Sequence, residues 1–440
     1  MKKADIALIL PFLCSIFLQL SIGEFPYELF AFPCNIICLI GSAIVLAIIQ
    51  WKWPNSTFCQ YVSSVRISVI AIGGFALCCT VLGVCKQNGD YHALGIHQVQ
   101  HSWWFIYSLS LLLIVLYMVI IKHLRRGGLR FALNHLGLLI ALVAGFVGSV
   151  DENSFQSVLW KGQGLQDFIV EYDDHGQALS YEAKIMLDGK ERSLRVNHPL
   201  KLNAYTDVYL LDYDTDNKEV QYCVIETVTQ PWKGAMYLGI IMMVIGSALL
   251  LIKGNELSFK NKDGYLKKGR LEILLLVVTI LFAIFLFVHL FSPYFDYKSM
   301  PAILQSWWFV PHVAAYMFAY AVLGCATLLC IIELFKGTAI YKQDVKCLVY
   351  IGLAFLSLGM LFGSLWAKKA WGTFWGWDPK ETWAVITWSI YLIYIHLSLQ
   401  GKNNTRALYY LLLLGFICIQ MCWWGVKLLP VAESSAHIYN

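Results

Sequence analysis

The chain has 440 residues, of which 58% are hydrophobic and only 14% are charged. Soluble domains carry roughly 25% charged residues, so this composition indicates a polytopic membrane protein and excludes an ordinary soluble enzyme. The net charge is +5, and the basic residues gather in short loops, which favours a role in membrane topology over nucleic-acid binding.

About eleven apolar segments are long enough to cross a bilayer as helices. The first of them lacks a clear small-residue cleavage site, so we expect a retained span and not a signal peptide. We expect the spans near residues 4–22, 29–50, 66–85, 103–121, 131–150, 234–252, 271–291, 311–334, 347–366, 383–400 and 407–428.

The basic loop residues predict the orientation of the spans. The sequence places such residues at the chain start and after spans 4, 6, 8 and 10 (Lys2, Lys3, Lys122, His123, Arg125, Arg126, Arg130, Lys253, Lys260, Lys262, Lys267, Lys268, Arg270, Lys336, Lys342, Lys346, Lys402, Arg406). If all lie on the cytoplasmic side, the N-terminus is cytoplasmic and the C-terminus periplasmic, which predicts a multi-pass protein of the bacterial inner membrane. Lys368, Lys369 and Lys380 break this rule, and they either snorkel to the interface or pair with ligand carboxylates.

One sizeable soluble part lies between spans 5 and 6, at about residues 151–232. Short alternating runs there predict strands over Asp167–Tyr172, Tyr181–Leu187, Arg192–Asn197 and Val220–Val228. The predicted fold class is therefore an all-α polytopic membrane protein with a small external β-rich domain. Its expected organisation is a membrane bundle over residues 1–150, the β-rich domain over 151–232 and a second membrane domain over 233–440.

Most of the 13 cysteines fall inside apolar runs, and we interpret them as small buried hydrophobic residues. The chain has no C-x-x-C motif, so we predict neither a zinc site nor a thioredoxin-like motif.

Four tryptophans fall within Trp371–Trp383, WGTFWGWDPKETW, around a single Asp-Pro turn. Tryptophan favours membrane–water boundaries and flat aromatic ligands, so we expect Trp371, Trp375 and Trp377 to form an aromatic shelf at the membrane surface. Asp378 is expected to cap the next helix, with Pro379 at its first position.

Two histidines are expected at matching depth within the membrane. His135 lies about four residues into span 5 and His396 about four residues before the end of span 10, so each is roughly 6 Å inside the cytoplasmic boundary. Such a pair suits bis-imidazole ligation of a haem, although two separately hydrogen-bonded histidines would give the same pattern.

Two further histidines are expected on the outer side, at the level of the tryptophans. His312 opens span 8, and His437 lies in the external tail, where it could equally be disordered. His289 is a weaker candidate. His92, His97 and His101 have a spacing that could bind a metal, but a solvated loop explains them as well.

Residues Trp371–His396, WGTFWGWDPKETWAVITWSIYLIYIH, resemble the tryptophan-rich WWD signature of haem-handling membrane proteins in cytochrome c maturation, and are most similar to the ResC or CcsA branch of system II. The N-terminal half resembles the ResB or CcsB partner in SWWF (Ser102–Phe105), HLGLLIALVAG (His135–Gly145), VNHPL (Val196–Leu200) and QPW (Gln230–Trp232). The whole chain therefore resembles a compact fusion of the two subunits, with an external domain shorter than is typical.

The resemblance implies a cytochrome c synthase that moves haem b from the cytoplasmic side to an external site. There it would attach the haem through thioethers to the C-x-x-C-H motif of an apocytochrome c kept reduced by a thiol-reducing system. His135 and His396 match the family's transmembrane haem ligands, and His312 and His437 match its external, catalytic pair. Trp371, Trp375, Trp377 and Trp383 would pack on the porphyrin, with Asp378 fixing the loop and Lys380 near the haem carboxylates.

Two other functions are compatible with these residues. A haem exporter or relay would use the same ligands to hand haem to a separate ligase. A b-type electron-transfer subunit would also bind haem between helices, but it usually carries two histidines on each of two helices, whereas the candidates here are spread over spans 5, 8 and 10 and the tail.

Overall fold

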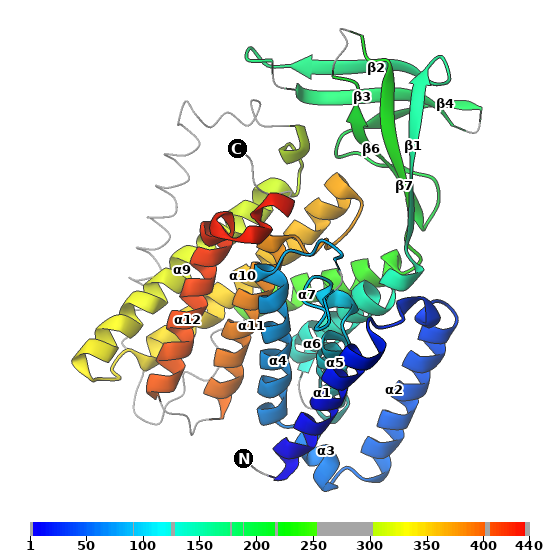
Figure 1. Cartoon of the computed structure of the whole chain (residues 1–440). Helices are drawn as coiled ribbons and strands as arrows, with labels where there is room; N and C mark the ends of the chain where they lie inside the picture. Colours follow the sequence, from blue (N-terminus) through cyan, green and yellow to red (C-terminus); the bar gives the residue numbers. More distant parts are fainter. Residues whose placement is uncertain are drawn as a thin grey trace.

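The computed structural model of the chain describes residues 3–90, 92–124, 128–176, 178–187, 189–215, 219–252, 302–400 and 405–435. Figure 1 shows a bundle of helices with a β domain at one end, which we call the outer end. Within the described residues, eight helices are long and apolar enough to cross a membrane, and two shorter apolar helices lie at Leu8–Ile22 and Lys233–Leu249. The protein is a multi-pass membrane protein, as predicted.

The N-terminal bundle contains α1 (Lys3–Ile22), α2 (Cys34–Lys52), the short α3 (Thr57–Val62), α4 (Val65–Val84), α5 (Trp103–His123) and α6 (Gly128–Leu142). A π-helical turn at Val143–Val147 continues α6 towards the sheet. The helix α2 begins later than the predicted span because Pro33 precedes it.

The C-terminal bundle contains α7 (Lys233–Ile252), α9 (Phe309–Lys336), α10 (Lys342–Trp371), α11 (Pro379–Leu399) and α12 (Thr405–Trp423). Helices therefore occupy all of the predicted spans except the one near 271–291, which lies outside the described residues.

The β domain is a seven-stranded sheet with strand order β4-β3-β2-β1-β7-β6-β5. Its strands are β1 (Asn153–Lys161), β2 (Gly164–Tyr172), β3 (Ala178–Leu187), β4 (Lys190–Arg195), β5 (Leu200–Lys201), β6 (Thr206–Tyr213) and β7 (Tyr222–Thr229). All four predicted strands are present, whereas β1, β5 and β6 were not predicted.

The sheet turns a corner between β1 and β2. Gly162 and Gly164 have positive φ angles of 81° and 105° there, a conformation that glycine adopts without a steric penalty. As a result β2 and β3 lie across β1 and β7 (Figure 1), and buried residues from both parts of the sheet form one apolar core (Leu165, Ala183, Ile185, Leu194, Val208, Leu210, Cys223, Ile225).

A buried ion network joins the sheet to the helices. The Asp207 carboxylate on β6 lies 2.8 Å from Lys233 Nζ at the start of α7 and 3.2 Å from Lys368 Nζ near the end of α10. Burial alone would raise the pKa of the Asp207 carboxyl, but the hydrogen bond from Lys233 and the charge of Lys368 outweigh it, so the pKa lies below its ordinary value. This network fixes the outer end of α10, from which the tryptophan loop starts.

The two bundles meet along α4 and α11. Trp383, near the start of α11, is only 7% exposed, and its indole Nε1–H donates to the Gly83 carbonyl of α4 at 3.0 Å. A Cβ on Gly83 would lie 3.2 Å from that ring, so the glycine permits the close approach. The tryptophan loop is thereby held by both halves of the chain.

Candidate functional site

The loop before α11 ends in a capping box, which confirms the predicted cap at Asp378. The backbone N–H of Lys380 donates to Asp378 Oδ1 at 2.8 Å, and Pro379 occupies the first helical position. The sequence analysis missed the role of Glu381, whose Oε2 accepts from the backbone N–H groups of Gly376 and Asp378 at 2.9 and 3.2 Å. The S/T/D-x-x-E spacing of a capping box is the signal that could have identified it.

The predicted tryptophan cluster divides into three environments. Trp375 lines a cavity beside His312. Trp371 packs against Trp366, with ring centroids 4.9 Å apart. Trp377 turns towards the N-terminal bundle, where its ring lies 5.4 Å from Phe146 and 6.0 Å from Phe105.

The expectation of one continuous shelf therefore needs correction, because only Trp375 of the four lines the cavity. Trp377 adopts a positive φ of 57°, which directs the chain across the loop. Trp377 and Trp383 both pack on a core cluster shared with α4 and α5. Their indoles join the two bundles and do not face His312.

His312 is held by contacts between α9 and α10. Its Nδ1 lies 2.8 Å from the Gly359 carbonyl, so with Nδ1 as the donor, Nε2 carries the lone pair that can bind a metal. A Cβ on Gly363 would lie 2.7 Å from the imidazole, and one on Gly359 would lie 3.0 Å from the Tyr316 ring. The two glycines therefore give the imidazole its place against α10.

The cavity beside His312 measures about 250 Å³. It lies between α9, α10, the start of α11 and the end of α12, and its lining includes aromatic, thioether and charged side chains (His312, Tyr316, Met317, Tyr320, Met360, Trp366, Trp375, Lys380, Glu381, Cys422, Trp423). Trp366 is a member that sequence reasoning missed, and its ring lies 5.7 Å from the His312 ring. Its spacing of three residues from Gly363, on the same face of α10, was the available signal.

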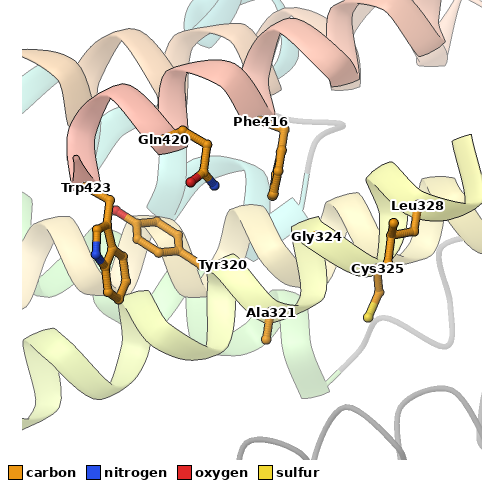
Figure 2. A pocket seen from close by; sticks show the side chains of 8 residues that line it. All are labelled: Tyr320, Ala321, Gly324, Cys325, Leu328, Phe416, Gln420 and Trp423. Carbon is orange, nitrogen blue, oxygen red and sulfur yellow. The ribbon is translucent and has the colours of Figure 1, made fainter. Parts of the chain in front are cut away.

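A second hollow adjoins this cavity. Figure 2 shows a groove of about 370 Å³ between α9 and α12, lined mainly by apolar atoms. Tyr320 and Trp423 line both hollows, so the groove is continuous with the His312 cavity. The combined space is elongated and bordered by aromatic rings.

The Trp375 indole supplies a donor for a ligand in this cavity. Among the residues that the structure describes, its buried Nε1–H donates to no acceptor. A buried indole N–H normally has a partner, so its position favours a bound acceptor. Lys380 also lines the cavity, and together these groups suit an anionic ligand.

Lys368, by contrast, is not available to a ligand carboxylate. Its side chain is 2% exposed and is held by Asp207, the Gln230 side chain and the Gly372 carbonyl. Neither snorkelling nor ligand pairing explains it, because its role is to anchor the β domain.

His437 lies outside the described residues. The described part of the tail ends at Ser435, whose hydroxyl lies 3.1 Å from Asp378 Oδ1 in the tryptophan loop. Lys86, after α4, forms an ion pair with Glu433 of the same tail at 2.6 Å. The chain thus enters its last residues directly beside the loop.

The inner histidines lie in the half of the bundle away from the β domain. His135 on α6 has its Nδ1 3.0 Å from the Phe131 carbonyl, and His396 on α11 has its Nδ1 2.7 Å from the Leu392 carbonyl. Each imidazole therefore bonds to the carbonyl four residues earlier in its own helix, which directs Nε2 away from the backbone. The two rings are close enough to interact electrostatically.

The remaining histidine candidates form no metal centre within the described residues. His92 and His97 have ring centroids 5.6 Å apart, but no group of three or more metal-ligating side chains occurs in these residues. His289 lies outside them.

Comparison with known proteins assigns the two halves separately. The family described as "Cytochrome C assembly protein" matches residues 240–432, and the family described as "ResB-like family" matches residues 129–230. The first match contains His312, His396 and the whole tryptophan loop, and the second contains His135 and the β domain.

Curated relatives carry the name "Cytochrome c biogenesis protein CcsA". That of Chlamydomonas reinhardtii is 35% identical over 31% of this chain and 42% of its own length, and that of Cuscuta exaltata is 34% identical over 30% of this chain and 55% of its own length. That of Liriodendron tulipifera is 46% identical over 20% of this chain and 27% of its own length. The chain thus spans between about a quarter and just over half of these relatives.

The two family matches lie on one polypeptide, in the order ResB-like and then cytochrome c assembly, and each contains its share of the candidate histidines. The chain belongs to the system II cytochrome c biogenesis proteins in which a ResB part and a CcsA part are fused.

Proposed function

We propose that this protein is a cytochrome c synthase that carries haem b from an inner to an outer site and joins it to apocytochrome c. The observation that carries the outer site is the His312 imidazole, whose Nδ1 is fixed by the Gly359 carbonyl at the wall of an aromatic cavity. Neutral imidazole presented through Nε2 is a common axial ligand of haem iron.

The residues of the cavity fit haem as the transported substrate. Trp375 offers an indole donor, and Lys380 a cation, to the two haem carboxylates. The aromatic walls suit a flat macrocycle, and the adjoining groove of about 370 Å³ gives its edge further room.

His437 is proposed as the second outer ligand. Two residues of extended chain span at most about 7 Å, and Ser435 is already hydrogen-bonded to the tryptophan loop. This attachment supports a tail that returns over the loop and completes the site from the side opposite α9.

His135 and His396 are proposed as the inner pair. Both imidazoles have Nδ1 bonded to a backbone carbonyl and lie near each other in the inner half of the bundle. With the outer end in the periplasm of a bacterial inner membrane, haem from the cytoplasm would meet this pair before the His312 site.

The chemistry at the outer site requires orientation more than acid–base catalysis. Each cysteine thiol of the C-x-x-C-H motif adds across one haem vinyl group, so that an S–C bond forms and the thiol proton passes to the neighbouring vinyl carbon. No electrons are gained or lost overall, provided that the thiols start reduced. The protein would hold the haem still, exclude competing ligands and let the histidine of the motif replace one of its own.

Expression of this chain with an apocytochrome c, in a host that lacks its own maturation system, tests the proposal. We expect covalent haem, detected by haem stain after denaturing electrophoresis. If holocytochrome forms only when a separate ligase is added, the protein is a haem relay and the synthase proposal is wrong.

A further inference from the structure

Two cysteines at the outer end of α2 lie side by side. Cys34 is the first residue of the helix and Cys38 follows one turn later, and their Sγ atoms are 4.0 Å apart. Cys34 is partly exposed and Cys38 is exposed, which corrects the expectation that these cysteines are buried hydrophobic residues.

The start of α2 is fixed to the base of the β domain. Asp151, two residues before β1, accepts hydrogen bonds from the Phe32 backbone N–H and the Asn35 side chain, each at 2.7 Å. Its carboxylate also accepts from Trp232 Nε1, just before α7, at 2.7 Å. The two thiols therefore lie at the outer end of the bundle, the end that carries the β domain and the tryptophan loop.

The geometry permits a reversible disulfide. Residues four apart in an α-helix have Cα atoms about 6 Å apart, inside the range of about 4.4–6.8 Å that disulfides span. Rotation of the two side chains could close the gap between the sulfurs without unwinding the helix. The first position of a helix also stabilises a thiolate, which makes Cys34 the better nucleophile of the two.

We propose that Cys34 and Cys38 form a redox-active dithiol that reduces the disulfide of the apocytochrome C-x-x-C-H motif before haem attachment. This inference rests on the proposed function, because thioether formation needs both substrate thiols free. It adds to that function a thiol–disulfide exchange site on the same chain and at the same end of the bundle.

The exchange balances as a transfer of two electrons. The Cys34 thiolate attacks one sulfur of the substrate disulfide, which forms a mixed disulfide and releases the first substrate thiolate. The Cys38 thiolate then attacks the Cys34 sulfur, which forms the Cys34–Cys38 disulfide and releases the second. A dithiol donor of the thioredoxin class, outside this chain, would return the pair to the reduced state by the same two steps in reverse.

A redox titration of the full-length protein tests the pair directly. Purified protein is equilibrated in mixtures of reduced and oxidised dithiothreitol, free thiols are alkylated, and the peptide that carries both cysteines is weighed by mass spectrometry. We expect one reversible two-electron transition that is lost in Cys34→Ser and unchanged in Cys14→Ser, which alters an exposed cysteine on α1. Thiols that stay reduced across the whole range would overturn the proposal.

A maturation assay tests the role of the pair. Without added reductant, the double variant Cys34→Ser, Cys38→Ser should give at least about fivefold less holocytochrome than the wild type, whereas Cys14→Ser should match it; added dithiothreitol should restore the double variant. Equal yields without reductant would refute the role. Absence of product from the wild type, even with pre-reduced apocytochrome, would instead refute the proposed synthase and leave the titration unaffected.

Discussion

The inner and outer histidines are positioned in different ways. His135 and His396 each bond to a carbonyl of their own helix, so a straight α-helix is enough to orient them. His312 bonds to the Gly359 carbonyl of a neighbouring helix, and its ring rests where Gly363 has no side chain. The inner imidazoles are therefore set by local structure, and the outer one by tertiary packing.

This difference predicts which changes each site tolerates. Substitutions that alter the packing of α9 on α10, or of α10 on the β domain, should damage the outer site and leave the inner pair intact. The outer site also depends on a loop held by both bundles, so haem attachment should be more fragile than haem binding.

Removal of the outer imidazole should have the largest effect. His312→Ala should lower the yield of holocytochrome by more than about a hundredfold, because even partners that only orient a metal ligand cost 10–100-fold when lost. Haem staining with and without added imidazole measures this, and partial recovery with imidazole is expected. Full activity without imidazole would exclude His312 from the site.

Loss of the buried carboxylate should weaken the junction between α10 and the β domain. Asp207→Asn leaves two buried lysines without a counter-ion and should cost about 3 kcal/mol of unfolding free energy. A matched control is Asp167→Asn, which breaks an exposed pair with Lys184 of 3.0 Å and should cost less than about 1 kcal/mol. Thermal unfolding in lipid nanodiscs compares the two, and equal losses would contradict the junction's importance.

The same junction should respond to acid in a defined direction. Because the folded pKa of Asp207 lies below its ordinary value of 3.8, its contribution to stability is present above that value and is lost as the pH falls through the lowered folded pKa. The stability difference between wild type and Asp207→Asn should therefore stay constant from neutral pH to about pH 5 and shrink only in stronger acid. A difference that vanished near pH 6 would point to another group.

Gly363→Ala should displace the outer imidazole without removing it. Its Cβ would lie 2.7 Å from the His312 ring, and overpacking of this kind costs about 1–3 kcal/mol, so we expect about a tenfold loss of holocytochrome. Gly324→Ala is the control, since its Cβ would meet Phe416 at an ordinary 3.6 Å. The inner haem should keep its absorption spectrum in both variants, and a changed inner spectrum in Gly363→Ala would show that the two sites are not independent.

Trp375→Phe should give the smallest effect. The substitution keeps an aromatic ring but removes the Nε1–H donor, and a lost hydrogen bond to a charged group corresponds to a loss of about tenfold or less in haem affinity. Haem titration of the purified protein measures it. Trp371→Phe, whose ring lies against Trp366 outside the cavity lining, is the control and should bind haem as the wild type does.

Local patterns in the sequence predicted the helices, the Asp378 cap and four strands, since each depends on residues near one another in the chain. The depth of His135 and His396 followed from counting residues along straight helices. The division of the tryptophans could not be predicted, because Trp377 and Trp383 are buried against α4 and α5, some 300 residues away in the chain. Lys368 was likewise misjudged, since its carboxylate partner lies on a separate domain.

The central claim is that two haem sites, one set locally and one by packing, lie on a single chain. Absorption spectra and pyridine haemochrome assays of the purified wild type, His135→Ala with His396→Ala, and His312→Ala test it most directly. We expect haem b in the wild type, loss of the inner haem in the double variant, and retention of the inner haem with no product in His312→Ala. Purified protein without haem, together with normal cytochrome c maturation by the double variant, would contradict the account.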